Sequence, residues 1–250
     1  MAQVVYEFPL NEKVRNYLRV EHLLGLLSEP KKTCEQHTEI QFFRDFFALL
    51  DLVERIDLRT ELLLDLHRYS VTLNSWLSHP NIDKKRIELQ IELVCTISEK
   101  LKESKRIGYE LKSDRFLTAI RQRFSIPGAT CSFDLPKLHY WLSLDKNTKQ
   151  SNLHQWLEPL TILKDAIYLA LEFIRNREEL SDVSAENGFY QGVTDSKIEL
   201  IRVQSSQTTL FYPTLSGNKY RYAVRFMKFS QNDNESTTVD ETVTFLLARC

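Results

Sequence analysis

The hydrophobic period of this 250-residue chain changes after about residue 177, and this change constrains the fold more than any other feature. Before that point, apolar side chains recur every three or four residues, as over 42–53, which is the pattern of amphipathic helices. After it, period two appears: over 220–227 the side chains of Tyr222, Val224 and Phe226 alternate with polar or smaller neighbours. The sequence therefore predicts an α+β protein.

The two patterns predict two domains. Each amphipathic helix needs partners to cover its apolar stripe, so we expect a helical bundle over 11–124 and 151–178. The remaining segments, 2–9, 125–150 and 179–250, form a mainly antiparallel β domain that is discontinuous in sequence. Because a sheet of two or three strands is marginal alone, the strand at the N-terminus is expected to pair with the C-terminal strands.

Individual elements follow from caps, turn residues and periods. The predicted helices cover 11–29, about 39–54, 57–76, 83–101, a short one that starts at Ser113 or Asp114 and runs to 124, and 151–177, the last with Pro159 in a first turn or kink. Asn11, Asp57 and Asp83 are the predicted caps of the first, third and fourth. The predicted strands cover 4–8, 131–133, 138–142, 197–203, 208–215, 220–227 and 239–247, with a polar loop at 230–237.

Composition excludes several classes of protein. The formal charge of −1, from 33 basic and 34 acidic residues, disfavours a globally basic nucleic-acid binder. No apolar run approaches the ~18 residues that a membrane-spanning helix requires. The N-terminus lacks the pattern of a secretory signal, and the four cysteines have no CxxC spacing. We therefore expect a cytoplasmic protein without a membrane insertion.

Catalytic motifs are weak. The phosphate-binding, dinucleotide-binding, zinc-protease and serine-hydrolase signatures do not occur, and the six histidines have no metal-ligand spacing. The sequence therefore predicts neither a metal site nor a cofactor. A pairing of Cys131 with His139 leaves a small hydrolase open as an alternative.

Arginines provide the more interesting pattern. Arg221 and Arg225 lie four apart in the alternating strand, so both project from one face, with Cα atoms ~13 Å apart. The simpler interpretation is a solvated outer face, and the alternative is a surface that grips carboxylates of an anion or peptide. A second group, Arg115, Arg121 and Arg123, does not share one helix face.

Long ordered strings in the sequence resemble the Z-ring-associated protein D family of bacterial cell division, across nearly the whole chain. They are YEFPLNEK at 6–13, LLDLVER at 49–55, RTELL at 59–63, RQRFSIPG at 121–128, CSFDLPKLHYWL at 131–142, NGFYQ at 187–191 and RYAVRFM at 221–227. Together the strings cover far more of the chain than a short catalytic motif does.

The resemblance implies a non-catalytic, cytoplasmic homodimer at the midcell division ring. Such proteins bind the C-terminal tail of the tubulin-like GTPase FtsZ and bundle its filaments, because two-fold symmetry duplicates each site. By motif, the implied tail-binding residues are Arg55, Arg221 and Arg225, and the second group ranks lower. The rival classes are the Cys/His enzyme, a nucleic-acid binder that uses these arginines, and a purely structural subunit.

Overall fold

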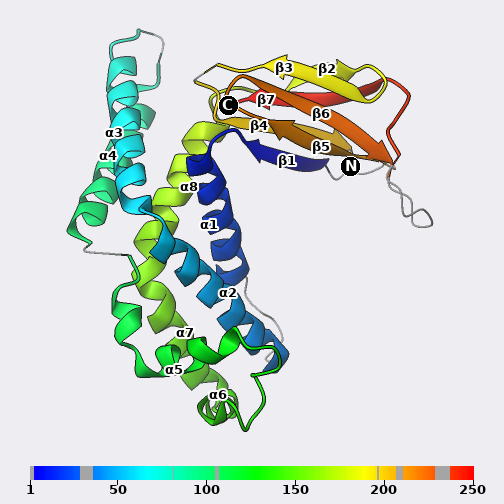
Figure 1. Ribbon diagram of the computed structural model, residues 1–250. Helices are drawn as coiled ribbons and strands as arrows, with labels where there is room; N and C mark the ends of the chain where they lie inside the picture. The colour runs from blue at the N-terminus through cyan, green and yellow to red at the C-terminus, as the bar shows by residue number, and fades with distance from the viewer. Residues whose placement is uncertain are drawn as a thin grey trace. The chain divides into compact units, whose positions relative to one another are not determined.

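The computed structural model describes residues 3–28, 36–80, 82–104, 107–195, 197–206, 211–228 and 237–250 (Figure 1). Contacts divide the chain into two compact units. The β unit comprises Met1–Leu18 and Leu171–Cys250, and the helical unit comprises Arg19–Ala170. The predicted α+β class is confirmed, and the divisions fall inside the first and last long helices rather than at 10/11 and 178/179.

The helices begin mostly where side-chain caps predict. They are α1 (Glu12–Ser28), α2 (Gln36–Arg55), α3 (Leu58–Trp76), α4 (Lys84–Glu103), η1 (Glu110–Ser113), α5 (Arg115–Phe124), α6 (Pro136–Leu142), α7 (Lys146–Leu157), η2 (Glu158–Leu160) and α8 (Thr161–Arg175). The carboxylates of Asp57, Asp83 and Asp114 accept backbone N–H bonds at the starts of α3, α4 and α5. Asn11 does the same for Val14 at 2.8 Å, so the predicted caps Asn11, Asp57 and Asp83 are confirmed, and of the two residues left open for α5 it is Asp114 that caps the helix.

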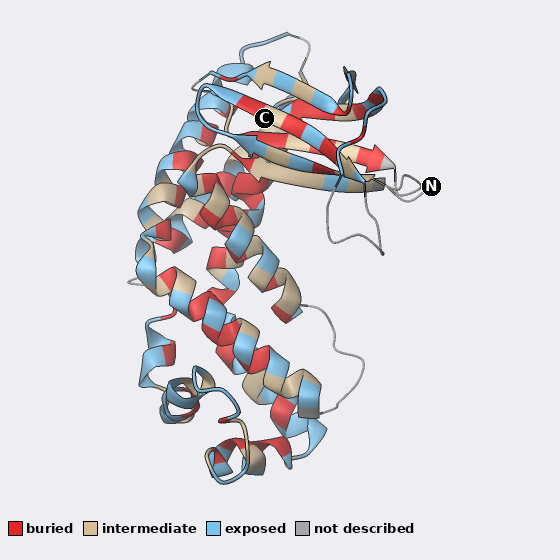
Figure 2. Ribbon diagram, turned by 45° about the vertical axis from the view of Figure 1, so that its right-hand side comes forward, coloured by how far each residue is buried: buried red, intermediate tan, exposed pale blue. Residues whose placement is uncertain are grey.

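An aromatic cluster forms the core of the helical unit. Phe43 of α2 is fully buried, and its ring lies 5.1 Å from that of Trp141 and 5.6 Å from that of Trp156. Buried residues follow one side of the helices, as Figure 2 shows. Helices α5, α6 and α7 therefore pack around α2 through large aromatic side chains.

The predicted strands at 131–133 and 138–142 are wrong. Residues 136–142 form α6, whose first turn contains Pro136, where its fixed φ and missing N–H suit a helix start. The buried residues Leu138, Trp141 and Leu142 have helical spacing. The segment 125–150 consequently belongs to the helical unit rather than to the β domain.

The predicted single helix over 151–177 is also corrected. Asp145, not Ser151, caps α7, and the turn η2, which contains Pro159, separates α7 from α8. Proline has no N–H to donate, so an interruption at this position is the expected consequence.

The β unit is a sandwich of two antiparallel sheets. The strands are β1 (Gln3–Pro9), β2 (Ser181–Ala185), β3 (Phe189–Val193), β4 (Leu200–Ser206), β5 (Phe211–Gly217), β6 (Arg221–Lys228) and β7 (Val243–Arg249). One sheet has the order β1-β4-β7-β2 and the other β3-β6-β5. Strand β1 pairs with β4, with Tyr6 opposite Val203, which confirms that the N-terminal strand joins the C-terminal ones.

Two further strands, β2 and β3, escaped prediction because each has only five residues with polar or glycine positions. The predicted 197–203, 208–215, 220–227 and 239–247 correspond to β4–β7, each shifted toward the C-terminus. Residues 208–210, and 230–236 of the predicted loop, lie outside the described residues.

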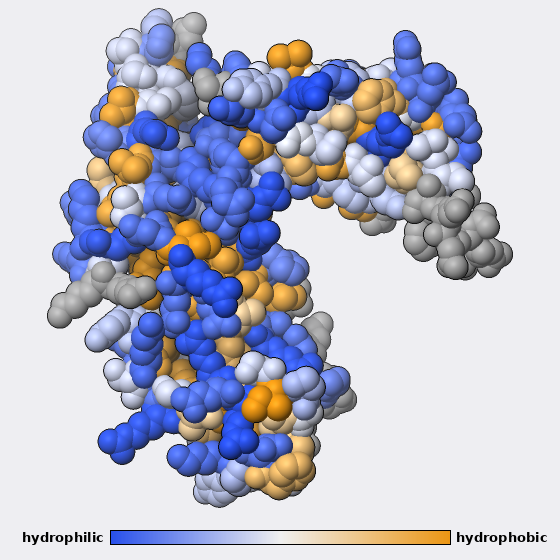
Figure 3. Space-filling view, in the orientation of Figure 1, coloured by the Kyte–Doolittle hydropathy of each residue, from blue (hydrophilic) through white to orange (hydrophobic). Residues whose placement is uncertain are grey.

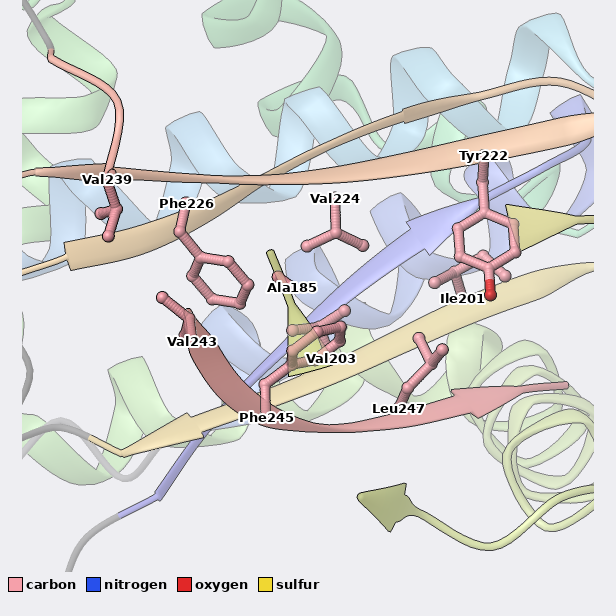
Figure 4. Packing of buried hydrophobic residues seen from close by; sticks show 10 residues of the cluster. All are labelled: Ala185, Ile201, Val203, Tyr222, Val224, Phe226, Val239, Val243, Phe245 and Leu247. Atoms are coloured by element: carbon pink, nitrogen blue, oxygen red, sulfur yellow. The ribbon is translucent and has the colours of Figure 1, made fainter. Parts of the chain in front are cut away.

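Apolar side chains from both sheets meet between them (Figure 4). Tyr222, Val224 and Phe226 point from β6 toward Phe245 and Leu247 of β7, as the alternation of β6 predicts. All five are nearly or completely buried, so β6 directs its odd-numbered side chains away from this core.

Two carboxylates anchor helix ends to the sandwich. Glu7 of β1 accepts bonds from Arg175 at the end of α8 and from Arg202 of β4. Glu199 pairs with Lys13 and Arg177, each at 2.8 Å. Burial acts to raise the pKa of Glu199, but these two cations outweigh it and hold that pKa below its usual value.

Substituting Glu199→Gln is expected to lower the free energy of unfolding by about 1–2 kcal/mol at neutral pH. Because the folded-state pKa of Glu199 lies below its ordinary value, the ion pairs contribute their full stabilisation at pH values above the ordinary glutamate pKa. That stabilisation is lost as the pH falls through the lower folded-state pKa. Urea denaturation at several pH values should therefore show the parent–variant difference shrinking in acid. The exposed Glu88→Gln is the control, and a difference independent of pH would contradict the assignment.

Candidate functional site

Two arginines share the outer face of the three-stranded sheet. Along β6 the side chains of Arg221 and Arg225 are exposed, whereas their neighbours Tyr222, Val224 and Phe226 face the core. The structure thus places Arg221 and Arg225 on one face of β6, as the period-two pattern predicts, and this face points away from the sandwich interior.

Apolar side chains of β3 lie beside both arginines. Phe189 is the cross-strand partner of Arg225, and Val193 is that of Arg221. The Arg225 guanidinium lies 5.2 Å from the centre of the Phe189 ring. Phe189 is 39% exposed and Val193 is 80% exposed, so this face offers apolar contact next to positive charge. Sequence reasoning missed both residues, although the string NGFYQ at 187–191 was a signal for Phe189; Val193 lies outside it.

The donors of these two guanidinium groups are not used by carboxylates within the described residues. Other arginines of the β unit have carboxylate partners: Arg175 and Arg202 bind Glu7, and Arg249 binds Glu178. A guanidinium above an aromatic ring still has free N–H groups at its edge. Arg221 and Arg225 with Phe189 and Val193, here called the arginine face, therefore suit a ligand with both carboxylates and apolar groups.

Arg55 belongs to the helical unit and is described within that unit alone. It is the exposed last residue of α2 and lines a hollow of about 430 Å³ at the turn into α3. Nearby, Arg59 donates to the carbonyl oxygens of Leu101 and Lys102 at 2.8 and 2.7 Å, which holds the end of α4. Arg55 has no such bond among the described residues, so its charge is available to a ligand.

The lower-ranked arginines have different surroundings. Arg121 bonds to Glu54 at 2.9 Å and also to Asp51, which links α5 to α2. Arg123 pairs with Asp134 at 3.1 Å. Arg115, the exposed first residue of α5, has no partner among the described residues and so stays available.

The ion pair between Arg121 and Glu54 also shifts the pKa values of both side chains. A hydrogen bond from Arg121 holds the pKa of Glu54 below its usual value, and the same bond raises the pKa of Arg121. Both directions are those of a stabilising ion pair, which indicates a structural role for Arg121.

Substituting Arg121→Met is therefore expected to cost stability rather than ligand binding. The variant keeps part of the apolar stem and loses half-exposed ion pairs, so the free energy of unfolding should fall by about 1 kcal/mol. Urea denaturation measures the stability, and titration with a peptide of the FtsZ tail, the ligand that the family resemblance implies, measures the binding. Weaker peptide binding with unchanged stability would make Arg121 a contact residue instead.

A second hollow, of about 600 Å³, lies in the helical unit between α5, α6 and α7. Its walls are largely aromatic, and the indole N–H groups of Trp141 and Trp156 donate to Asn152 and Asp114. The Asp114 carboxylate also caps α5, so its oxygens are occupied by structural bonds. This hollow therefore lacks a carboxylate free for acid–base chemistry among its described lining residues.

The bonds of Cys131 and His139 do not support a nucleophile and its base. The Cys131 thiol donates to the Gly128 carbonyl at 2.8 Å, and His139 Nε2 lies 3.2 Å from the Thr130 carbonyl. Cys95, Cys131 and Cys250 are free thiols, and Cys34 lies outside the described residues. The contacts of Cys131 and His139 are thus those of a local turn.

Within the described ranges, no group of three or more His, Cys, Asp or Glu side chains could hold a metal ion. The same part of the chain contains no helix that is long and apolar enough to cross a membrane.

On the face drawn in Figure 3, hydrophilic residues dominate and the orange hydrophobic patches are small and separate.

A helical unit and a β sandwich define an α+β protein that presents two exposed arginines on one surface of a sheet. Residues 18–225 match the ZapD family, described as a cell division protein. Proteins named "Cell division protein ZapD" from Shewanella baltica (strain OS185) and Shewanella oneidensis are each 39% identical over 250 residues, covering all of both chains. One from Shewanella sp. (strain MR-7) is 38% identical over the same length. The chain belongs to the ZapD family of cell division proteins.

Proposed function

We propose that this protein is a non-catalytic division factor that binds the C-terminal tail of FtsZ at the midcell ring in the cytoplasm. As a homodimer it carries two equivalent sites, so one dimer cross-links two filaments and bundles them. The observation that carries the proposal is the arginine face: two guanidinium groups without carboxylate partners among the described residues, beside exposed apolar side chains. Family membership supports the role in division.

In this proposal Arg221 and Arg225 hold carboxylates or carbonyl oxygens of the tail. Phe189 and Val193 receive its apolar side chains. Arg55, and at lower rank Arg115, are further candidate contacts in the helical unit, because each is exposed and has no ion pair among the described residues.

Co-sedimentation of FtsZ filaments tests the proposal directly. This protein is mixed with filaments of complete FtsZ and with filaments that lack the C-terminal tail, and light scattering measures its own oligomeric state. Bundling only when the tail is present supports the proposal. Equal bundling of both filaments, or bundling by a monomer, would contradict it.

A further inference from the structure

Strand β3 lies at the edge of its sheet, with β6 on one side and no other described strand on the other. Two bonds define the ladder: Phe226 N–H donates to the Gly188 carbonyl at 2.8 Å, and Thr194 N–H donates to the Tyr220 carbonyl at 2.9 Å. Bonded pairs in an antiparallel ladder recur at every second residue. The main-chain groups of residues 190 and 192, the Gly188 carbonyl and the Thr194 N–H therefore face β6.

The main-chain groups of the alternate residues face the open edge. Gln191 and Val193 each direct an N–H and a C=O away from β6, and both residues are exposed. No bond to these groups is present from outside the strand within the described residues. This edge can therefore accept the backbone of another extended segment.

The other edge strands carry residues that discourage such pairing, and β3 does not. Strand β1 contains Glu7 and Pro9, β2 contains Asp182, and β5 contains Pro213. Charges and prolines are the usual means by which natural sheets protect an edge. The sequence of β3, FYQGV, has neither, so it is the one unprotected edge among the described strands of the sandwich.

The same edge borders the arginine face. The side chains of Phe189 and Val193 project on the side of Arg225 and Arg221, their cross-strand partners. The Arg225 guanidinium already leans over β3, since it lies 5.2 Å from the Phe189 ring. A strand added ~4.8 Å beyond β3 would bring every second side chain within reach of this positive charge.

We propose that this edge binds an extended acidic peptide by strand addition. The main-chain groups of Gln191 and Val193 pair with the peptide backbone, and its alternate side chains contact the arginine face. This inference rests on the proposed function, whose tail it takes as the peptide, and adds the mode of recognition. A second copy of the chain is a poorer occupant, because edge-to-edge pairing of two β3 strands would gather four arginines on one continuous face.

The test removes one main-chain donor and changes little else. In Gln191→Pro the N–H that faces the open edge is lost, whereas the ladder to β6 does not use it. Pro213 of β5 shows that this sheet accepts such a residue: the Asn218 N–H donates to the Arg221 carbonyl at 2.9 Å, so the nitrogen of Pro213 also points away from β6. Gln191→Ala keeps the N–H and is the matched control.

With a synthetic peptide of the FtsZ C-terminal tail, Gln191→Pro should bind roughly tenfold more weakly and Gln191→Ala nearly as well as the parent. In the parent, hydrogen exchange at the Gln191 and Val193 amides should slow on peptide binding, a measurement that does not depend on how the proline variant folds. Unchanged exchange at both amides would overturn strand addition.

Three outcomes separate this inference from the proposed function. If Gln191→Pro binds like the parent while Arg225→Ala binds weakly, strand addition is wrong and the arginine face still binds the tail. If Arg225→Ala and Arg221→Ala both bind like the parent, the arginine face itself is wrong. If Gln191→Pro turns a dimer into a monomer, the edge is a contact between copies, and strand addition by the peptide is overturned.

Discussion

Replacing Arg225 with alanine is expected to weaken binding of the FtsZ tail roughly 10- to 100-fold, because a charge-assisted arginine contact contributes about 1.5–3 kcal/mol. Its guanidinium is held over Phe189 and has no carboxylate partner among the described residues, so the substitution breaks no described ion pair. Folding should therefore be nearly unaffected. Titration of a labelled tail peptide measures the affinity, and Arg225→Glu, which repels carboxylates, should abolish bundling.

The control for this prediction is Arg86→Ala. Arg86 is an exposed arginine of α4, also without an ion pair among the described residues, and it lies outside the strings shared with the family. The Arg86→Ala variant should bind the tail peptide with the affinity of the parent protein. The arginine face would be rejected if the Arg221/Arg225 double variant kept parental affinity, or if it lost affinity only because the sandwich had unfolded, which circular dichroism would reveal.

Selecting the candidate arginines for tail binding needed the structure as well as the sequence. The alternation over 221–227 was enough to place Arg221 and Arg225 on one outer face of a strand. No local pattern distinguishes them from Arg121, because the carboxylates that occupy Arg121 lie 67 and 70 residues earlier in the chain. Whether an arginine is free or paired depends on such distant contacts, which periodicity does not encode.

Local rules predicted the caps and the long helices and failed on short elements. Asp57, Asp83 and Asp114 begin their helices because a carboxylate satisfies the first free N–H groups, which is a local interaction. The seven residues of α6 and the five residues of β3 are too short to display a period clearly. Their structure depends on what they pack against, as the burial of Trp141 against Phe43 shows.

That packing leads to the largest expected effect on stability. Phe43→Ala should lower the free energy of unfolding by about 3–5 kcal/mol, because it leaves a cavity in a core that cannot close around it. The Phe43 ring is completely buried and meets rings from α5, α6 and α7, with Phe116 at 6.0 Å, Trp141 at 5.1 Å and Trp156 at 5.6 Å. For a chain of this size, a loss of that magnitude lowers the melting temperature by about 6–20 °C.

Tryptophan fluorescence during urea denaturation measures this effect, since Trp141 and Trp156 belong to the same cluster. Phe133→Ala is the matched control: it deletes an identical side chain that is 82% exposed, so it should change the free energy of unfolding by less than about 0.5 kcal/mol. If both substitutions cost the same, Phe43 does not organise the core. If only Phe43→Ala is strongly destabilising, then α6, the segment whose sequence was predicted to form a strand, is held in its helix by aromatic contacts with α2.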